Sequence, residues 1–307
     1  MKLLITGAGG FIGRNLIERI KNISNIDIYT ISRIRIMPES SVTNYCCDIL
    51  DEHAVYKIFE QQTFDVVIHL AALTVHEDII NNKNLALRTN LRGTENIIGA
   101  FNRFCRNAVF YYASSGKVYG RTDEMPITEY AIERPTTILG KGKYITERII
   151  EFYAEDVESN KYIIMRIFNV YGGGQRENFI VPTLLKQLSK GNQLELGNIY
   201  DKRDYLYIED LISAIEALVR DRQRLSHFEI VNIGSGVPIS VEDIVKELKR
   251  ILNRKEIEIS ISKQRMRSDE TEVEYCNTKK LYELTGWEQK FDLRAGLTET
   301  CRQQGLL

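Results

Sequence analysis

The sequence predicts an α/β protein with a doubly wound parallel sheet and a smaller C-terminal α/β lobe. Short runs rich in β-branched and aromatic residues alternate with segments whose apolar residues recur at helical spacing. A glycine-rich turn also joins the first of these runs to the first helical segment. Strands that alternate with helices indicate a parallel sheet covered on both faces.

The regular alternation occupies the first part of the chain. Strands are expected at residues 2–6, 27–31, 65–69, 108–112 and 162–167. Helices are expected at residues 14–21 and 94–104, where apolar side chains share one helix face. We therefore place the boundary of a first domain at residues 1–168, to which some later segments return, and a second lobe at 169–307.

Beyond residue 170 the alternation is looser. Helices are expected at residues 181–189, 209–219 and 240–252. Ser240 and Asp243 form a capping-box pattern at the start of the last one. Another short helix is expected between Asn277, a candidate N-cap, and Gly286, which would end it.

Composition excludes several classes of protein. The 307 residues suffice for about two domains, and 43% hydrophobic with 27% charged residues is ordinary for a globular protein. Because 41 basic residues nearly balance 42 acidic ones, no overall field attracts nucleic acid or a membrane surface. The five cysteines show no zinc or redox spacing, so we expect no metal and a reducing compartment, the cytoplasm.

The turn after the first expected strand carries glycines at positions 7, 10 and 13, with Phe11 and Ile12 at the helix start. One glycine permits a tight turn, one lets the backbone approach a pyrophosphate, and one lets helix and strand pack closely. Such a pattern alone is also compatible with a structural turn. Its place between strand and helix favours a Rossmann dinucleotide site.

The end of the second expected strand indicates which dinucleotide binds. An acidic residue there would bind the ribose 2′-hydroxyl of NAD, whereas an arginine accommodates the 2′-phosphate of NADP. The chain has Ser32 and Arg33 at this place, with Arg35 close by. NADP(H) is therefore favoured, and NAD(H) binding without an acidic anchor is the alternative.

Three further segments follow the glycine turn in order: Asp48-Ile49, then His69-Leu70-Ala71-Ala72, then Asn90 before a Gly-Thr pair. With that turn they resemble the extended short-chain dehydrogenase/reductases of the NAD-dependent epimerase/dehydratase type, which act on nucleotide sugars. By itself, His69 is more simply a core histidine. The resemblance implies a cofactor site made of Gly7, Gly10, Phe11, Ile12, Gly13, Ser32, Arg33, Asp48, Ile49, Leu70, Ala71, Ala72, Asn90 and Lys143.

The segment from Ser114 to Gly120 resembles the family's Ser-Ser-x-x-Val-Tyr-Gly motif and places Ser115 at the catalytic Ser/Thr position. Family 4,6-dehydratases typically carry Asp-Glu immediately after that position. This chain has Gly116 and Lys117 there. A standard 4,6-dehydratase is therefore disfavoured.

The family's Tyr-x-x-x-Lys motif is incomplete. Lys143 fits the motif lysine, and its 26-residue distance to Asn169 fits the family spacing. The tyrosine position then holds Leu139, which has no proton to exchange. General acid-base catalysis is typically worth ~10²–10⁴-fold, so another group would have to serve. Tyr144, Lys117 and His76 are candidate substitutes, although a five-residue shift turns Tyr144 by about 140° around the helix.

Later segments resemble the substrate motifs of the family. Asn169 lies in Arg-x-x-Asn-Val-Tyr-Gly, Asn178 in the loop that holds the sugar-nucleotide diphosphate, and Arg203 in Arg-Asp-Tyr. Arg267 stands where the family commonly has Arg-Pro-Gly-Asp. The rigid fork of an arginine suits phosphate oxygens, although either arginine alone could be a surface charge.

The sequence thus predicts an NAD(P)-dependent nucleotide-sugar epimerase or 4-ketoreductase that acts through a 4-keto sugar, with Ser115 and Lys143 in an atypical active site. Two alternatives stay open. One is a homologue that binds cofactor or sugar nucleotide without catalysis, and the other is an elimination enzyme with a different base. The partner is a nucleotide-diphosphate sugar, and the resemblance implies a homodimer formed through helices near Thr94 and Lys143.

Overall fold

The computed structural model describes residues 1–34, 42–254, 256–262 and 271–307. Arg35 and Arg267, which the sequence analysis singled out, lie outside these residues. The chain forms two compact units. The first unit comprises residues 1–120, 132–167 and 215–231, and the second unit comprises residues 121–131, 168–214 and 232–307.

A seven-stranded sheet forms the centre of the first unit, and its strand order is β10-β6-β5-β4-β1-β2-β3. Its strands are β1 (Lys2–Thr6), β2 (Asp27–Ser32), β3 (Val42–Cys46), β4 (Val66–His69), β5 (Val109–Ser115), β6 (Lys161–Ile167) and β10 (Phe228–Ile233). The pairings from β6 across to β3 are parallel. Because the chain order reverses between β1 and β4, the carboxyl ends of these two strands form the point where ligands bind in such sheets.

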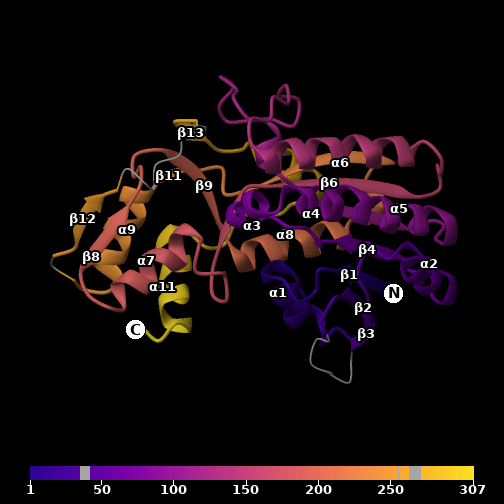
Figure 1. The fold of residues 1–307 in the computed structure, drawn as a ribbon, viewed down its shortest axis with the longest axis horizontal. Coiled ribbons are helices and arrows are strands. Elements are labelled where there is room, and N and C mark those ends of the chain that lie inside the picture. Colours follow the sequence, from indigo (N-terminus) through magenta and orange to yellow (C-terminus); the bar gives the residue numbers. More distant parts are fainter. Residues whose placement is uncertain (35–41, 255, 263–270) are drawn as a thin grey trace. The chain divides into compact units, whose positions relative to one another are not determined.

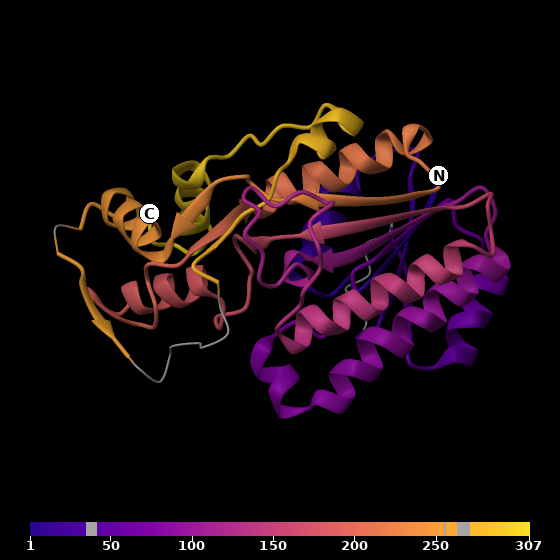
Figure 2. The same cartoon turned by 90° about the horizontal axis from the view of Figure 1, so that it is seen from above.

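Helices cover both faces of this sheet. Helices α5 (Gly93–Phe104) and α6 (Ile138–Ala154) run side by side on one face, next to α2 (Glu52–Gln61) (Figure 2). Helix α1 (Phe11–Ile20) and the last turns of α8 (Ile208–Arg220) lie on the other face (Figure 1). The doubly wound parallel sheet that the sequence predicts is therefore confirmed.

The main core of the first unit fills the space between the sheet and the helices α2, α5 and α6. Val67, Phe110 and Ile164 contribute from the strands, and Phe101 and Ile150 from the helices. All are buried, so the strand ends that carry the candidate site rest on a packed layer.

Short elements connect β4 to β6 at the carboxyl edge of the sheet. They are α3 (His76–Asn81), α4 (Lys83–Leu87), a π-helical turn η1 (Arg88–Arg92) and a 3-10 turn η2 (Gly116–Val118). A π-helical turn inside a helix frequently marks a functional site.

The second unit holds two small sheets. One joins β11 (Pro238–Ser240), β9 (Lys202–Tyr207), β13 (Val273–Glu274) and β7 (Asn169–Tyr171), and the other pairs β8 (Gln193–Leu196) with β12 (Glu258–Ile261). Its helices are α7 (Ile180–Leu188), α9 (Val241–Ile251), α10 (Lys279–Thr285) and α11 (Leu293–Gln303). A 3-10 turn, η3 (Arg222–Arg224), follows α8 in the first unit.

Local signals in the sequence predicted some elements better than others. The capping box of Ser240 and Asp243 is present, and Gly286 ends α10 with φ +67°. Asn277 was expected as the N-cap of α10, but Thr278 occupies that position and Asn277 Oδ1 accepts from the amide of Lys279. The sequence analysis did not anticipate β3, because its Val-Thr-Asn-Tyr-Cys run lacks the apolar content of a central strand.

Two properties of the described residues bear on function. Within them, no helix is long and apolar enough to cross a membrane. Within the same part of the chain, no cluster of three or more His, Cys, Asp or Glu side chains could hold a metal ion.

Candidate cofactor and catalytic site

The glycine-rich turn between β1 and α1 depends on close backbone approaches. Gly7 has φ +71°, and a Cβ atom there would lie 2.6 Å from the amide nitrogen of Ala71. A Cβ atom on Gly13 would lie 2.5 Å from the carbonyl oxygen of Gly7. Both neighbours are backbone atoms that cannot move cheaply, so these two positions require glycine.

The start of α1 fits the pyrophosphate of a dinucleotide. Gly10 is the N-cap residue and has no side chain to occupy the amides of the first turn. Phe11 and Ile12 open the helix, where amide groups lack intrahelical partners and the helix dipole favours negative charge. This cradle, at the carboxyl end of β1, is suited to a phosphate group.

At the end of β2 the described residues are Ser32, Arg33 and Ile34, none of which carries a carboxylate. Ser32 is buried, and its hydroxyl donates to the carbonyl oxygen of Ile34. Arg33 is exposed. On the adjacent strand β3, Asn44 Oδ1 accepts a 2.7 Å hydrogen bond from the hydroxyl of Thr30. The structure thus leaves the cation of Arg33 accessible at this strand end.

The pair Asp48-Ile49 follows β3, with Asp48 at the surface and Ile49 in the core. Asp48 is exposed and its Oδ1 accepts from the amide of Leu50 at 3.0 Å. Ile49 is buried against Gly93, where a Cβ atom would lie 2.5 Å from Ile49 Cδ1. Asn96 Nδ2 donates to the carbonyl oxygen of Ile49 at 2.9 Å. Ile49 therefore fixes the loop to α5, and Asp48 is left at the surface.

His69 is a buried link between three elements. Its Nδ1 lies 2.6 Å from Thr6 Oγ1 and its Nε2 lies 2.9 Å from Thr94 Oγ1. The Thr94 hydroxyl donates to the carbonyl oxygen of Asn90 at 2.7 Å, so it must accept from His69. The imidazole is therefore the neutral Nε2–H tautomer, in which Nδ1 accepts from Thr6.

The pKa of His69 agrees with this neutral role. Burial, together with the nearby positive charge of Lys143, lowers the pKa to about 3. His69 thus holds the end of β1, the end of β4 and the start of α5 together without carrying charge. From the sequence, His69 was predicted only as a core histidine or as part of a family motif.

Asn90 holds the segment that leaves β4. Its Oδ1 accepts from the amide of Leu73 at 2.8 Å and its Nδ2 donates to the carbonyl oxygen of Leu73 at 3.0 Å. Leu70, Ala71 and Ala72, just before it, are half-buried. Because both ends of its amide are engaged, Asn90 shapes the wall of the site through the backbone of this segment.

Ser115 ends β5 and begins η2. Its Oγ accepts from the amide of Lys117 at 3.2 Å and its side chain is half-buried. Helix α6 packs directly on this turn, because a Cβ atom on Gly140 would lie 2.3 Å from the carbonyl oxygen of Lys117. The hydroxyl of Ser115 therefore lies at the edge where β5 meets the start of α6.

Helix α6 presents Leu139 and Lys143 on the same face, since they are four residues apart. Thr137 caps the helix by accepting from the amide of Gly140 at 3.0 Å. Leu139 lies in the first turn and is half-buried, whereas Lys143 is 3% exposed. The first turn therefore carries an alkyl group where the sequence comparison with the family expects a phenol.

Lys143 is the only charged group that the sequence analysis placed at the catalytic site. Its Nζ donates 2.5 Å to the carbonyl oxygen of Ala113 and lies 4.6 Å from the centre of the Tyr112 ring. Burial lowers its pKa to about 7, and the carboxylate of Glu147 acts in the opposite direction. The ammonium is thus held by β5, two residues before Ser115.

The candidate substitutes for the missing tyrosine are placed differently. Tyr144 is half-buried and packs with Arg148, whose guanidinium lies 5.5 Å from its ring centre. One residue after Lys143, it points about 100° away around α6. Lys117 is half-buried in η2. The side chain of His76 lies outside what the structure describes.

In the second unit, two of the predicted substrate residues, Asn169 and Arg203, lie at β9. Asn169 Nδ2 donates to the carbonyl oxygen of Asp204 at 3.1 Å. Arg203 is buried, donates from Nη1 to the carbonyl oxygen of Lys202, and lies 3.5 Å from the carboxylate of Asp201. Asn178 is exposed in the turn before α7. Asn169 and Arg203 are therefore brought together, and Asn178 stands apart from them along the chain.

Asp204 organises this region and was missed by the sequence analysis. It is fully buried, and its carboxylate accepts from Ser235 at two atoms, from the amide of Gly236 and from the amide of Cys276. Burial raises its pKa, and these hydrogen bonds oppose that change. Its place directly after Arg203 in the Arg-Asp-Tyr motif was the signal that could have revealed it.

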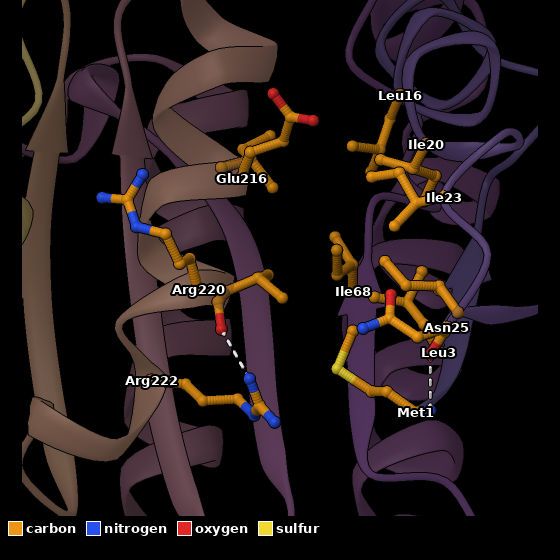
Figure 3. Close-up of a pocket in the computed structure, with 13 residues that line it drawn as sticks. Met1, Leu3, Leu16, Ile20, Ile23, Asn25, Ile68, Glu216, Arg220 and Arg222 are labelled. Carbon is orange, nitrogen blue, oxygen red and sulfur yellow. Dashed lines mark hydrogen bonds between the residues drawn. The ribbon is translucent and has the colours of Figure 1, made fainter.

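A separate cavity of about 450 Å³ lies between α1 and α8 in the first unit (Figure 3). Its walls include Leu16, Ile20 and Ile68, and Glu216 and Arg220 stand on the α8 side. Arg19 bridges the two helices by an ion pair of 3.1 Å with Glu216. None of the predicted site residues lines it, so we assign it no part in the chemistry.

The fold defines a class of protein: an α/β protein with a Rossmann-like parallel sheet, whose candidate dinucleotide site lies at the carboxyl ends of β1 and β4. More particularly, the chain belongs to the NAD dependent epimerase/dehydratase family, whose model matches residues 3–234. The family resemblance of the sequence motifs is therefore confirmed.

Individual relatives are nucleotide-sugar enzymes and match nearly the full chain. A GDP-6-deoxy-D-talose 4-dehydrogenase of Aggregatibacter actinomycetemcomitans is 28% identical over 97% of this chain and 96% of its own length. A dTDP-4-dehydro-6-deoxyglucose reductase of Escherichia coli is 29% identical over 83% of both chains. The UDP-glucose 4-epimerase of Thermotoga maritima, solved with UDP-glucose, is 25% identical, covers 99% of both chains and has a TM-score of 0.88.

Proposed function

We propose that the protein is an NADP(H)-dependent reductase of the 4-keto group of a nucleotide-diphosphate sugar. The observation that carries the proposal is the first turn of α6, where Leu139 precedes a buried Lys143 on the same helix face beside Ser115. The cofactor and sugar-binding groups are retained, while the usual proton-exchanging side chain is replaced by an alkyl group. Relatives named as a 4-dehydrogenase and a reductase of nucleotide-linked sugars support the substrate class.

The missing phenol should slow an epimerase more than a reductase. An epimerase that works through a 4-keto sugar must oxidise an alcohol and then reduce a ketone in every turnover, so the slower oxidation limits it. A reductase needs a proton only for an oxygen that becomes strongly basic as the hydride arrives. Such an oxygen takes a proton from weak donors, including a serine hydroxyl or water.

Each site residue has a defined task in this proposal. The amides at Gly10 to Gly13 hold the pyrophosphate, and Lys143 binds the ribose next to the nicotinamide. Bound NADPH supplies the hydride. Ser115 donates a hydrogen bond to the keto oxygen and orients it, while Asn169 and Arg203 hold the sugar nucleotide through its polar groups and diphosphate.

The preference for NADPH over NADH rests on the end of β2. Ser32 and Arg33 stand where a carboxylate would repel a 2′-phosphate. The exposed guanidinium of Arg33 is available to that phosphate. NADH binding without an anchor is the alternative that the assay below separates.

The second candidate function is binding without catalysis, and Leu139 is the observation that favours it. In that case NADPH and sugar nucleotide bind, but no 4-keto sugar is reduced. The retained burial of Lys143 and its contact with Ala113 support the catalytic proposal instead.

The test is a substrate panel assayed by NADPH and NADH oxidation, with product masses measured in parallel. GDP-linked and dTDP-linked 4-keto-6-deoxy sugars should consume NADPH and gain two mass units, whereas UDP-glucose should not be epimerised. Binding with no turnover on the whole panel supports the second candidate. Loss of one water from a hexose substrate indicates an elimination and contradicts both.

The assembly and the compartment are part of the same proposal. Ile145 and Phe152, seven residues apart on α6, are 45% and 65% exposed, which supports a homodimer formed through α5 and α6. All five cysteines are free thiols, which supports a reducing compartment such as the cytoplasm. Light scattering of wild type and Phe152→Lys tests the dimer, because the substitution should give a monomer.

A further inference from the structure

A buried ion pair of the first unit lies close to the candidate catalytic residues but outside the motifs that predict them. Glu147 on α6 and Arg166 on β6 are both fully buried. Arg166 Nη2 lies 2.7 Å from Glu147 Oε2, and Arg166 Nε lies 3.2 Å from Glu147 Oε1. This two-point contact is the strong form of an arginine–carboxylate pair.

The pair joins the two elements that carry Ser115 and Lys143, β5 and α6. The hydroxyl of Ser114, the residue before Ser115, donates to Glu147 Oε1. Lys143 lies one helical turn before Glu147 on α6, and Arg166 is paired in register with Ser114 across β5 and β6. A second carboxylate, Glu133, accepts from Arg166 Nη2 at 2.6 Å, and the ring of Tyr119 lies 4.7 Å from the guanidinium.

We propose that the Glu147–Arg166 ion pair is a positioning element of the cofactor site, which fixes Lys143 against the end of β5 and keeps its ammonium group charged. The inference rests on the proposed contact of Lys143 with the cofactor, and it does not depend on which sugar is reduced. A buried ion pair is weak as a source of stability, because desolvation offsets the attraction of the two charges. Its position one helical turn from Lys143 gives the pair a role other than stability.

Three titratable groups lie near the ammonium of Lys143, on the elements packed around it, and only one of the three is charged. His69 on β4 is neutral, because burial lowers its pKa to about 3. Tyr112 on β5 is neutral, because burial raises its pKa. Glu147 on α6 is the negative charge that opposes the loss of a proton from Lys143.

Charges on neighbouring elements complete the surroundings. Lys117 on η2 packs its backbone carbonyl against Gly140, and Arg148 on α6 lies 3.9 Å from Glu147 Oε2. Both are basic, and so is Arg166, so Glu147 is the group among those named here that stabilises the charged form of Lys143. Without Glu147, Lys143 would lose its proton at a lower pH.

The test measures the affinity for NADPH and NADH by nucleotide fluorescence between pH 5.5 and 9. In wild type, affinity should fall as pH rises through the pKa of Lys143. In Glu147→Gln, the midpoint of this fall should move down by about 1 pH unit, which makes binding about tenfold weaker at pH 8. Glu151→Gln is the matched control: it removes the same charge from the next turn of α6, where Glu151 pairs with Arg148, and should keep the wild-type midpoint.

A double variant separates positioning from folding. Glu147→Leu with Arg166→Met replaces the pair by apolar groups, which often leaves stability unchanged. If the pair serves the cofactor site, this variant should fold, as judged by thermal unfolding, and its midpoint should still lie below that of wild type, by less than in Glu147→Gln because a positive charge is removed with the carboxylate. A wild-type pH profile in either the single or the double variant would overturn the inference.

Failure of the underlying assumption has its own signature. If wild type binds neither NADPH nor NADH, the cofactor role of Lys143 is wrong and the inference falls with it. If the cofactor binds with the expected pH profile but no sugar is reduced, only the proposed reaction is wrong.

Discussion

The candidate sites of the two units are built from different kinds of group. In the first unit, close backbone approaches at Gly7 and Gly13 and an uncapped helix start form the candidate cofactor cradle, and Lys143 is a buried basic group of the same candidate site. In the second unit, Arg203 and its acidic neighbours Asp201 and Asp204 form the candidate substrate site. Shape dominates in the first unit and charge in the second, so substitutions should have different consequences in each.

The largest effect should come from restoring the phenol that the first unit lacks. Leu139→Tyr places a proton-exchanging group one turn before Lys143, on the same face of α6. General acid catalysis of this kind is typically worth ~10²–10⁴-fold, so reduction of a 4-keto sugar should accelerate by about that factor. Initial rates of NADPH oxidation at saturating sugar measure it.

The control is Leu139→Phe, which adds the ring without the hydroxyl. It should leave the rate at the wild-type level. If Leu139→Tyr and Leu139→Phe give the same rate, the site does not simply lack a phenol hydroxyl. The alignment of Leu139 with the family's tyrosine is then wrong.

The next largest effect should appear in the second unit. Asp204→Asn replaces a carboxylate that accepts from Ser235, Gly236 and Cys276 by an amide whose NH₂ group faces backbone donors. Each buried donor left without an acceptor costs about 1–3 kcal/mol, so unfolding in urea should require ~2–3 kcal/mol less free energy. Asp201→Asn, which weakens one 3.5 Å ion pair, should cost under about 1 kcal/mol.

This pair of variants also tests how independent the two sites are. Affinity for NADPH should be unchanged in Asp204→Asn at temperatures where it stays folded, because the cradle at β1 and α1 belongs to the first unit. A parallel loss of NADPH affinity would show that the separation into shape and charge does not hold.

The same difference explains how much could be predicted from sequence. The glycine turn, the capping box and the alternation of strands and helices are local patterns, so Gly7, Gly13 and Ser240 were predicted with their physical reasons. Asp204 and the pair Glu147–Arg166 act through contacts between residues 19 to 72 positions apart. Periodicity carries no information about such partners, so these residues were missed.

Edge elements were missed for a related reason. The strand β3 alternates polar and apolar residues only weakly, and its pairing with β2 supplies what its composition lacks. Within the site, the sequence placed Asn90 at the cofactor but could not show that both ends of its amide bind Leu73. Sequence motifs therefore indicate which residues form the wall of the site, but the hydrogen bonds that shape this wall can be seen only in the three-dimensional structure.

The smallest effect is expected at Arg33, an exposed charge of the candidate cofactor site. Arg33→Ser removes the guanidinium beside Ser32, so the preference for NADPH over NADH should fall by about tenfold, which corresponds to about 1.4 kcal/mol. The loss should shrink at high salt, because an exposed charge is screened by ions. Arg19→Ser makes the same charge change on α1, where Arg19 pairs with Glu216, and should leave the preference unaltered. Titrations of both cofactors at low and high ionic strength measure these changes. Equal loss of NADPH and NADH affinity in Arg33→Ser would mean that the arginine contacts a part common to both cofactors, and the first unit would then use charge as well as shape to hold the dinucleotide.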